Sequence, residues 1–180
     1  MCGGIVEKGL IHLYFGDGKG KTSAAMGLAA RAAGNSMKVL IAQFFKSSQS
    51  GEIALLKELS GVQVLLGKKS KKFVWNMSVD ELAQCREEQE TLLLQAWDTA
   101  IKEACDLLIL DEGLDVVNFG FVSEQTFLAM LSQKPLGLEV VLTGHQQNDA
   151  LIEAADYVTE IRKVKHPFDS GVKQRRGVEF

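Results

Sequence analysis

The chain has 180 residues, a net charge of −3 and 46% hydrophobic residues. This length suits one domain with a good core, and the hydrophobic share argues against a disordered chain. The slightly negative charge argues against a nucleic-acid surface, and the longest apolar stretches are too short to span a membrane. We therefore expect one domain over residues 1–180, with a loose tail at residues 1–8 that is not a secretory signal. We expect neither nucleic acid nor a membrane as a partner.

The three cysteines are odd in number, far apart in the chain and form no C-x-x-C pair. They are Cys2, Cys85 and Cys105. This usage is typical of a reducing compartment and argues against a zinc site. We expect a cytoplasmic protein in which none of these thiols has a functional role.

The first predicted element is a strand at residues 10–15 that leads into a glycine-rich loop at residues 16–22. Strong helix formers follow as far as Ala33. The order strand, glycine loop, helix distinguishes a phosphate-binding loop from a chance cluster of glycines. Three glycines let the backbone turn tightly and bring bare N–H groups near an anion, and the helix adds the positive end of its dipole. These glycines are Gly16, Gly18 and Gly20.

Lys21 and Thr22, at the end of this loop, are the side chains that phosphate chemistry needs. The lysine offers a flexible charge for phosphate oxygens, and the threonine offers a hydroxyl of the kind that ligates Mg²⁺. The standard loop reads G-x-x-x-x-G-K-[ST], which would place its first glycine at Phe15, but the glycine stands at Gly16. The loop is therefore one residue short, and we expect a different phosphate register. The alternative is a glycine-rich turn without a ligand.

Strand and helix signals alternate through the rest of the chain. Strands are predicted at residues 38–45, 62–66, 107–110, 139–143 and 157–161. Helices are predicted at residues 51–59, from a capping box at 78–81 to about 104, from 123 to 135, and at 148–155. This alternation predicts an α/β protein with a mostly parallel sheet and helices on both faces. With the phosphate loop, it favours a three-layer P-loop NTPase-like (RecA-like) fold.

The strand at residues 107–110 is followed at once by Asp111 and Glu112, the arrangement of a Walker B motif. One carboxylate there holds Mg²⁺ directly or through water, and the next acid orients a water in hydrolytic enzymes. The alternative is a pair of solvated acids at a strand end. Because ligands bind at the carboxyl ends of parallel strands, we expect one crevice to be shared by the glycine loop, residues 43–46, the loop after Leu66, residues 111–112 and residues 143–144. The two motifs together predict a nucleoside triphosphate with Mg²⁺.

Residues 67–77 form the most irregular stretch, in which four lysines precede Phe73 and Trp75. Two interpretations are open. The stretch is either a solvated loop whose aromatic side chains dock on the core, or a mobile cover over a flat aromatic or macrocyclic ligand.

With these features in place, the chain resembles the P-loop type of ATP:corrinoid adenosyltransferases, the cob(I)yrinic acid a,c-diamide adenosyltransferases. The resemblance runs from about Gly9 to Phe180 and is carried by residues 16–22, 29–34, 43–46, 51–52, 73–75, 110–112, 141–144, 164–173 and 176–180. The short loop and the C-terminal segment are its specific parts, since an ordinary ATPase has no reason to carry either.

The resemblance implies a reaction, and with it substrates and partners. A reduced Co(I) corrinoid attacks C5′ of ATP, inorganic triphosphate leaves, and a Co–C bond to the adenosyl group forms, in adenosylcobalamin biosynthesis or salvage. The family is further expected to bind ATP reversed relative to ordinary P-loop enzymes, to use Mg²⁺ with Mn²⁺ as a substitute, to form homodimers and to rely on a flavoprotein reductant. Displacement at a saturated carbon needs no protein base, so positioning and leaving-group stabilisation must supply the rate.

The family pattern, placed on the motifs above, gives each residue an expected role. The expected catalytic residues are Lys21, Thr22 and Glu112. The expected metal ligands are Thr22, Asp111 and Glu112. The expected nucleotide-binding residues are Gly16, Asp17, Gly18, Lys19, Gly20, Lys21, Thr22, Ser23 and Arg31, although a helix salt bridge is an equal alternative for Arg31. Phe73 and Trp75 match the aromatic pair on the corrinoid side, which is thought to displace the lower cobalt ligand.

Two positions depart from the family pattern. Gly113 stands where the family usually has Leu, and His145 stands where it usually has Arg. These changes keep open a non-catalytic, nucleotide-dependent corrinoid binder. A P-loop ATPase or small-molecule kinase that cleaves the γ-phosphate, with Glu112 aligning the acceptor, is another alternative. His166 is interpreted either as a ligand contact or as structural, and His12 as structural.

Overall fold

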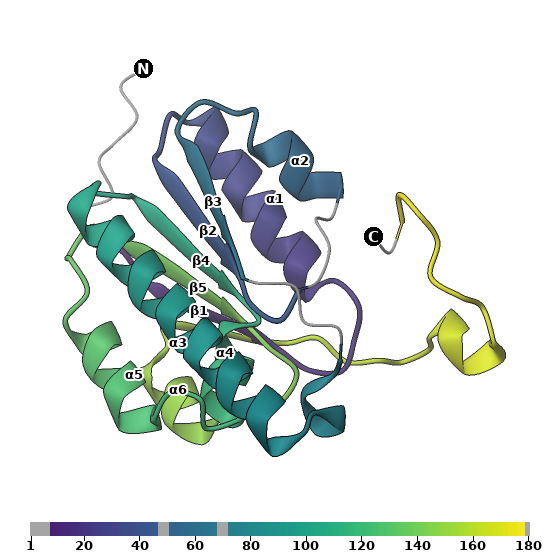
Figure 1. Ribbon diagram of the computed structural model, residues 1–180. Helices are drawn as coiled ribbons and strands as arrows, with labels where there is room; N and C mark the ends of the chain where they lie inside the picture. Colours follow the sequence, from purple (N-terminus) through teal and green to yellow (C-terminus); the bar gives the residue numbers. More distant parts are fainter. Residues whose placement is uncertain (1–7, 47–50, 68–71, 179–180) are drawn as a thin grey trace.

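The computed structural model describes residues 8–46, 51–67 and 72–178. Within them, six strands form one parallel sheet in the order β3–β2–β4–β5–β1–β6 (Figure 1). The strands are β1 (Ile11–Phe15), β2 (Val39–Gln43), β3 (Val62–Leu66), β4 (Leu107–Asp111), β5 (Glu139–Thr143) and β6 (Tyr157–Glu160). The helices are α1 (Lys21–Gly34), α2 (Gly51–Leu56), α3 (Val79–Lys102), α4 (Gly113–Asn118), α5 (Glu124–Ser132) and α6 (Asp149–Ala154), with short 3₁₀ helices η1 (Val74–Asn76) and η2 (Pro167–Ser170).

The sheet is the middle layer of three. Figure 1 shows α1 and α2 over one face and α3 to α6 over the other. Strand β4 is apolar up to its last residue because both of its faces are buried. Leu108 and Leu110 pack in the core on the α3 side, whereas Leu107 and Ile109 pack in the core on the α1 side. The predicted three-layer α/β fold with a parallel sheet is confirmed.

The predicted strands and longer helices lie where the sequence places them. Both hydrogen bonds of the predicted capping box at the start of α3 are present. The Ser78 hydroxyl accepts from the Glu81 N–H at 3.3 Å, and the Glu81 carboxylate accepts from the Ser78 N–H at 2.8 Å. Helix α4 is an addition that the sequence analysis does not predict. Its six residues are too few for a helical period to show, and five of them are buried.

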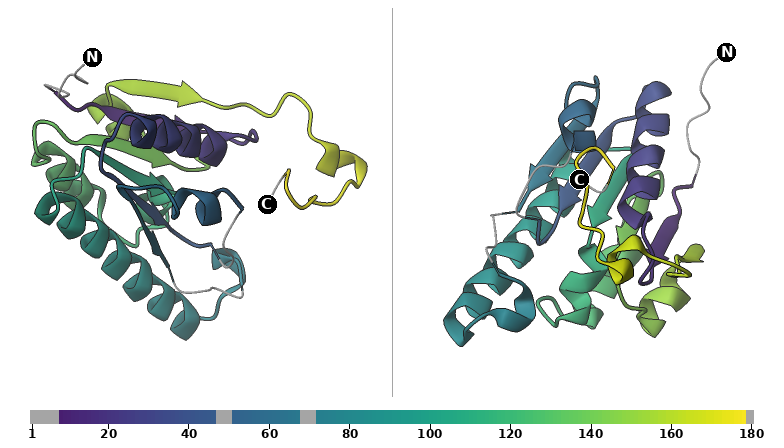
Figure 2. Two further views of the ribbon diagram at one scale, coloured as in Figure 1. Left: turned by 90° about the horizontal axis from the view of Figure 1, so that it is seen from above. Right: turned by 90° about the vertical axis from the view of Figure 1, so that its right-hand side faces the viewer.

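After β6 the chain leaves the sheet as an extended segment, residues 162–178, which we call the C-terminal arm. Figure 2 shows it running past the carboxyl ends of the strands, bending at η2 and turning back. Its two ends contact the glycine loop. The Asp17 carboxylate accepts from the Lys163 N–H at 2.8 Å, and the Lys19 ammonium donates to the Val178 carbonyl at 3.1 Å. The expected loose tail at residues 1–8 lies outside the described residues except for Lys8.

Candidate functional site

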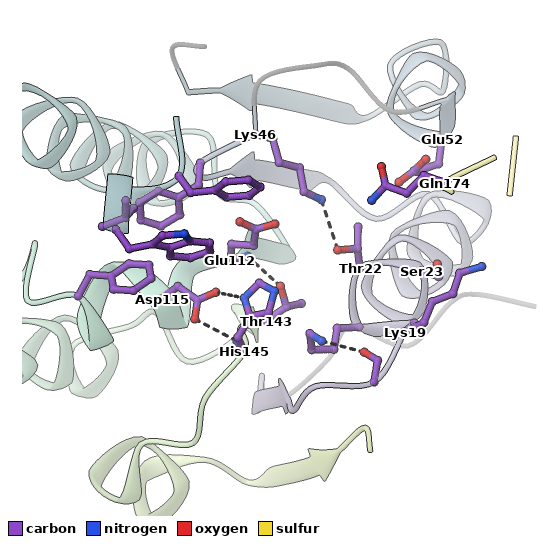
Figure 3. A pocket seen from close by; sticks show the side chains of 18 of the residues that line it. Lys19, Thr22, Ser23, Lys46, Glu52, Glu112, Asp115, Thr143, His145 and Gln174 are labelled. Carbon is purple, nitrogen blue, oxygen red and sulfur yellow. Dashed lines mark hydrogen bonds and ion pairs between the residues drawn. The ribbon is translucent and has the colours of Figure 1, made fainter. Parts of the chain in front are cut away.

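A cavity of about 590 Å³ lies at the carboxyl ends of the strands (Figure 3). Its walls come from segments far apart in the sequence, as expected for a parallel sheet. They are residues 18–23 of the glycine loop and α1, residues 45–46 after β2, Glu52 of α2, residues 72–75 and 77, Glu112, Asp115 and Phe119 after β4, Thr143 and His145 at the end of β5, and Gln174 and Val178 of the C-terminal arm. The predicted shared crevice is therefore present.

The glycine loop is shaped by the segment that passes over it. Gly16 has a φ of 120°, and a Cβ there would lie 2.4 Å from the Ile161 carbonyl oxygen. A Cβ on Gly18 would lie 2.7 Å from the same oxygen. The N–H of Gly16 donates to the His145 carbonyl at 3.2 Å, and that of Gly18 to the Ile161 carbonyl at 2.8 Å. These two N–H groups are bonded within the protein, so an anion would bind further along, at the start of α1.

The start of α1 is suited to an anion. Gly20 caps the helix without a side-chain hydrogen bond, and no acidic residue stands in the first turn. The first N–H groups and the helix dipole are therefore not neutralised by a side chain of their own helix. Lys21 lies beside them, with its ammonium bonded to the carbonyls of Gly16 at 2.6 Å and Gly18 at 2.8 Å. Burial lowers the pKa of Lys21, and the nearby acids Asp115 and Asp17 oppose that shift.

Asp111 lies at the centre of a cluster of polar side chains. It is 0% exposed, and its carboxylate accepts four hydrogen bonds. The donors are the Thr22 hydroxyl (2.9 Å), the Thr143 hydroxyl (2.8 Å), the Gln43 amide (3.0 Å) and the Lys46 ammonium (2.5 Å). Sequence analysis predicted Thr22 and Asp111 and missed the other three donors. The cluster forms because Gln43, Asp111 and Thr143 end three neighbouring strands, whose register places them side by side.

The oxygens of Thr22 and Asp111 fit a hard divalent cation, which prefers hydroxyl, carboxylate, phosphate and water ligands. Within the described residues, no group of three or more His, Cys, Asp or Glu side chains is arranged to hold a metal. A Mg²⁺ ion here would take its remaining ligands from phosphate and water, as it commonly does. Lys46, however, bonds to both protein oxygens, reaching the Thr22 hydroxyl at 3.3 Å.

Glu112 caps α4 in the left-handed region, with a φ of 64°. Its backbone N–H donates to the Thr143 hydroxyl at 2.8 Å, which fixes its side chain in the wall of the cavity. Burial raises the pKa of Glu112 to about 7, and the neighbouring Asp111 carboxylate adds to the rise. At neutral pH this carboxyl group is therefore divided between its neutral and charged forms.

His145, the departure noted in the sequence, is held by the buried Asp115. The backbone N–H of His145 donates to one carboxylate oxygen at 3.0 Å, and Nδ1 lies 2.8 Å from the other. This hydrogen bond raises the pKa of His145. Figure 3 shows the imidazole beside Thr143 in the cavity wall. It also lines a second cavity of about 420 Å³ between the glycine loop and the C-terminal arm. This departure therefore places an imidazole, which is positively charged when it is protonated, near the phosphate loop.

Phe73 and Trp75 stack on each other, with ring centroids 4.8 Å apart and planes 3° apart. They are 66% and 72% exposed, so the interpretation in which they dock on the core is wrong. Instead they face the same cavity as the glycine loop. Val74, between them, turns inward and packs against the core, which orients the two rings outward.

Several singled-out residues lie elsewhere. Arg31 is exposed in the last turn of α1, about 15 Å along the helix from Lys21, and does not line the cavity. Asp17 lines the second cavity and binds the C-terminal arm. His12 contacts Glu139 at 2.5 Å and the Tyr14 hydroxyl at 3.1 Å, a structural role as predicted.

His166 accepts from the Phe168 N–H at 3.1 Å through Nδ1, and it also lines the second cavity. Burial raises the pKa of the free thiols Cys85 and Cys105, which makes them poor nucleophiles. Cys2 lies outside the described residues.

Comparison with known proteins identifies the family of the chain. A family model described as ATP:corrinoid adenosyltransferase BtuR/CobO/CobP matches residues 7–180. A corrinoid adenosyltransferase of Pseudomonas aeruginosa is 35% identical over 179 residues, which cover 97% of this chain and 85% of the relative. One of Escherichia coli K12 is 34% identical, covering 97% and 87% of the two chains. The solved cytoplasmic domain of EssC superposes with a TM-score of 0.52 at 16% identity, covering 94% of this chain and 34% of that one, and it shows the fold alone.

Proposed function

This chain belongs to the ATP:corrinoid adenosyltransferase family, and we propose the substrates, cation and residues through which it works. Its activity is the ATP-dependent adenosylation of a corrinoid. The observation that best supports the site is that the glycine loop and the exposed Phe73–Trp75 pair line one cavity. A phosphate site and a flat apolar platform thus face the same space, as a reaction between ATP and a macrocycle requires. The proposed acceptors are cob(I)alamin and cob(I)yrinic acid a,c-diamide.

The proposed chemistry is a displacement at a saturated carbon. The electron pair of Co(I) forms the Co–C5′ bond, the C5′–O bond breaks, and its electrons leave with inorganic triphosphate. No proton is removed from carbon, so no general base is needed. The protein's part is to align cobalt, carbon and leaving oxygen and to exclude water from a strongly reducing nucleophile.

Positive charge for the departing triphosphate comes from the start of α1 and from Lys21. Because Lys21 is partly buried, its charge acts through a medium that screens it less than water does. Thr22 and Asp111 would hold Mg²⁺, or Mn²⁺ in its place, and the ion would supply further positive charge to the triphosphate when bound. Glu112 lies next to them in the cavity wall. We propose that ATP binds with its triphosphate in the glycine loop and its ribose toward the aromatic pair.

The aromatic pair is the proposed platform for the corrinoid. Two stacked, exposed rings offer an apolar surface that contacts the lower face of the macrocycle and displaces the lower cobalt ligand. We propose that Trp75 and Phe73 act on the reduction of Co(II) and not on ATP. This assignment follows from their aromatic side chains, which offer a flat apolar surface and carry no charge for a phosphate group.

The proposed partners are a second copy of the chain and a flavoprotein reductant, in the cytoplasm. All four residues of the edge strand β6 are exposed, which supports an interface between copies. Free thiols at Cys85 and Cys105 support a reducing compartment. In the part of the chain that the structure describes, none of the helices is long and apolar enough to cross a membrane.

The direct test is to incubate the protein with ATP, Mg²⁺ and chemically reduced cobalamin under anaerobic conditions. The expected products are a light-sensitive Co–C species, followed by its absorbance, and inorganic triphosphate. Release of ADP and phosphate alone would instead favour an ATPase or kinase. Tight binding of both substrates without turnover would favour a corrinoid carrier.

A further inference from the structure

Lys46 holds the two oxygens that a divalent cation would need. We propose that its ammonium group is a resident cation of the Thr22–Asp111 site, and that it leaves only in exchange for a divalent ion that arrives with triphosphate. This inference rests on the proposed binding of ATP and a metal ion at the glycine loop. It adds a role for a residue to which the sequence analysis gave none.

The first support is geometric. The Lys46 ammonium lies 2.5 Å from an Asp111 oxygen and 3.3 Å from the Thr22 hydroxyl. A Mg²⁺ ion bound to the same oxygens would stand about 2.1 Å from each of them. The two cations would then occupy overlapping positions. Metal entry at these two ligands therefore requires the lysine to move.

The second support is the charge of Asp111. This carboxylate is 0% exposed, and its four bonds fill the positions that a carboxylate offers to donors. Three of the donors are neutral groups, the hydroxyls of Thr22 and Thr143 and the amide of Gln43, and Lys46 is the cation among the four. A buried carboxylate without a compensating charge is strongly unfavourable. Lys46 is thus held until another positive charge replaces it.

The third support is that the Lys46 side chain has space to move within the cavity. Its side chain is 22% exposed and lines the same cavity as Lys19 and Ser23. Figure 3 shows it reaching across the cavity toward Thr22, at the start of α1. Triphosphate oxygens bound at that helix start would lie within reach of the displaced ammonium. Metal and triphosphate would then favour each other's binding, and such coupling is reciprocal.

Mn²⁺ is a suitable probe, because its free form is counted directly by electron paramagnetic resonance. Mn²⁺ would be titrated into the wild type, Lys46→Met and Lys72→Met without nucleotide or corrinoid. Lys72 is the matched control, since it lines the same cavity and carries the same charge but pairs with Glu81 at 2.7 Å. We expect Lys46→Met to bind Mn²⁺ about tenfold more tightly than the wild type, and Lys72→Met to bind it as the wild type does.

A second readout is thermal unfolding. Lys46→Met should melt below the wild type without metal, and Mn²⁺ should raise its melting temperature more than that of the wild type. Adding Asp111→Asn to Lys46→Met should abolish both the Mn²⁺ binding and the thermal rescue. If Lys46→Met does not fold, Lys46→Gln takes its place in both measurements, with the same expected results.

Two results would overturn the proposal. One is that the wild type binds Mn²⁺ without nucleotide as tightly as Lys46→Met, and the other is that Lys72→Met gains as much affinity as Lys46→Met. The Mn²⁺ titration contains no corrinoid, so its result is independent of the test of the proposed function. If the protein shows the exchange but forms no Co–C product, the proposal for Lys46 stands and the proposed adenosyltransferase function is wrong.

Discussion

At the scale of single residues, Glu112 carries the clearest pH dependence. Its pKa is raised to about 7 by burial, from an ordinary value of 4.5, so the folded protein holds this proton more tightly than the unfolded chain does. The resulting stability is fully present below about pH 4.5 and is lost as the pH rises through about 7. Since one pKa unit corresponds to about 1.4 kcal/mol and Glu112 is partly exposed, we expect a loss of about 2 kcal/mol.

Glu112→Gln should remove this dependence. Urea unfolding of both proteins at about pH 5 and about pH 8 measures the change. From the lower to the higher pH, the free energy of unfolding of the variant should rise by about 2 kcal/mol relative to that of the wild type. A difference between the two proteins that does not vary with pH would show that Glu112 ionises normally.

His145 should make ATP binding depend on pH, whereas an arginine at this position should not. Its hydrogen bond to Asp115 raises its pKa, Glu112 acts in the same direction, and burial and Lys21 oppose the rise. The imidazolium therefore persists to higher pH than that of an ordinary histidine, and its charge is lost as the pH rises through the raised pKa. We expect ATP affinity to fall about tenfold over that range in the wild type, but not in His145→Arg. Isothermal titration at several pH values tests this, and parallel profiles for the two proteins would contradict it.

The residues of the site differ in how visible they are in the sequence. Thr22 and Asp111 are found from local patterns, because a phosphate loop and a strand-end acid each have fixed neighbours. Gln43, Lys46 and Thr143 come from other strand ends, and only the order and register of the sheet place them around Asp111. A sequence shows which strand ends are polar but not which of them become neighbours.

At the scale of elements, η1 should contribute to corrinoid chemistry and little to folding. Trp75 is 72% exposed, so Trp75→Ala should change stability by less than about 0.5 kcal/mol. It should leave ATP affinity unchanged and slow the reduction of bound Co(II) corrinoid. Lys21→Ala should do the reverse, weakening ATP binding and sparing the corrinoid. Calorimetry with ATP and the spectrum of Co(II)-corrinoid in the presence of ATP separate the two effects, and equal loss of ATP affinity in both variants would contradict the assignment.

Elements differ in predictability for a similar reason. Strands buried on both faces appear as apolar runs, and α3 appears through its capping box and helical period. Helix α4 has neither signal, because a short helix that is almost wholly buried shows no exposed polar face. Its position depends on Gly113, where a Cβ would lie 2.7 Å from the Cβ of Leu110. The glycine that looked like a departure from the family pattern is therefore required by packing.

At the scale of the whole molecule, the sheet order determines where the site lies. Strand β5 lies between β1, which leads into the glycine loop, and β4, which ends in Asp111. The register pairs Tyr14 with Thr143 and Gln43 with Asp111, so neighbouring strands end at the same level. The cavity follows from that alignment. The alternation of elements predicts a parallel sheet with a crevice at its carboxyl edge, but strand order is a property of the folded chain.

The edge strand β6 carries the last prediction, which concerns the proposed homodimer. Within the described residues β6 pairs only with β1, and its four residues are all exposed. An unpaired edge with apolar side chains, such as Val158 at 43% exposure, favours pairing with another chain. Val158→Asp should therefore convert a dimer into a monomer in sedimentation velocity. Val164→Asp is the control, because Val164 is the same residue type and, at 97%, more exposed than Val158, but it lies on the C-terminal arm, away from the sheet. A wild-type monomer at micromolar concentration, or equal dissociation by both variants, would exclude this edge as the interface.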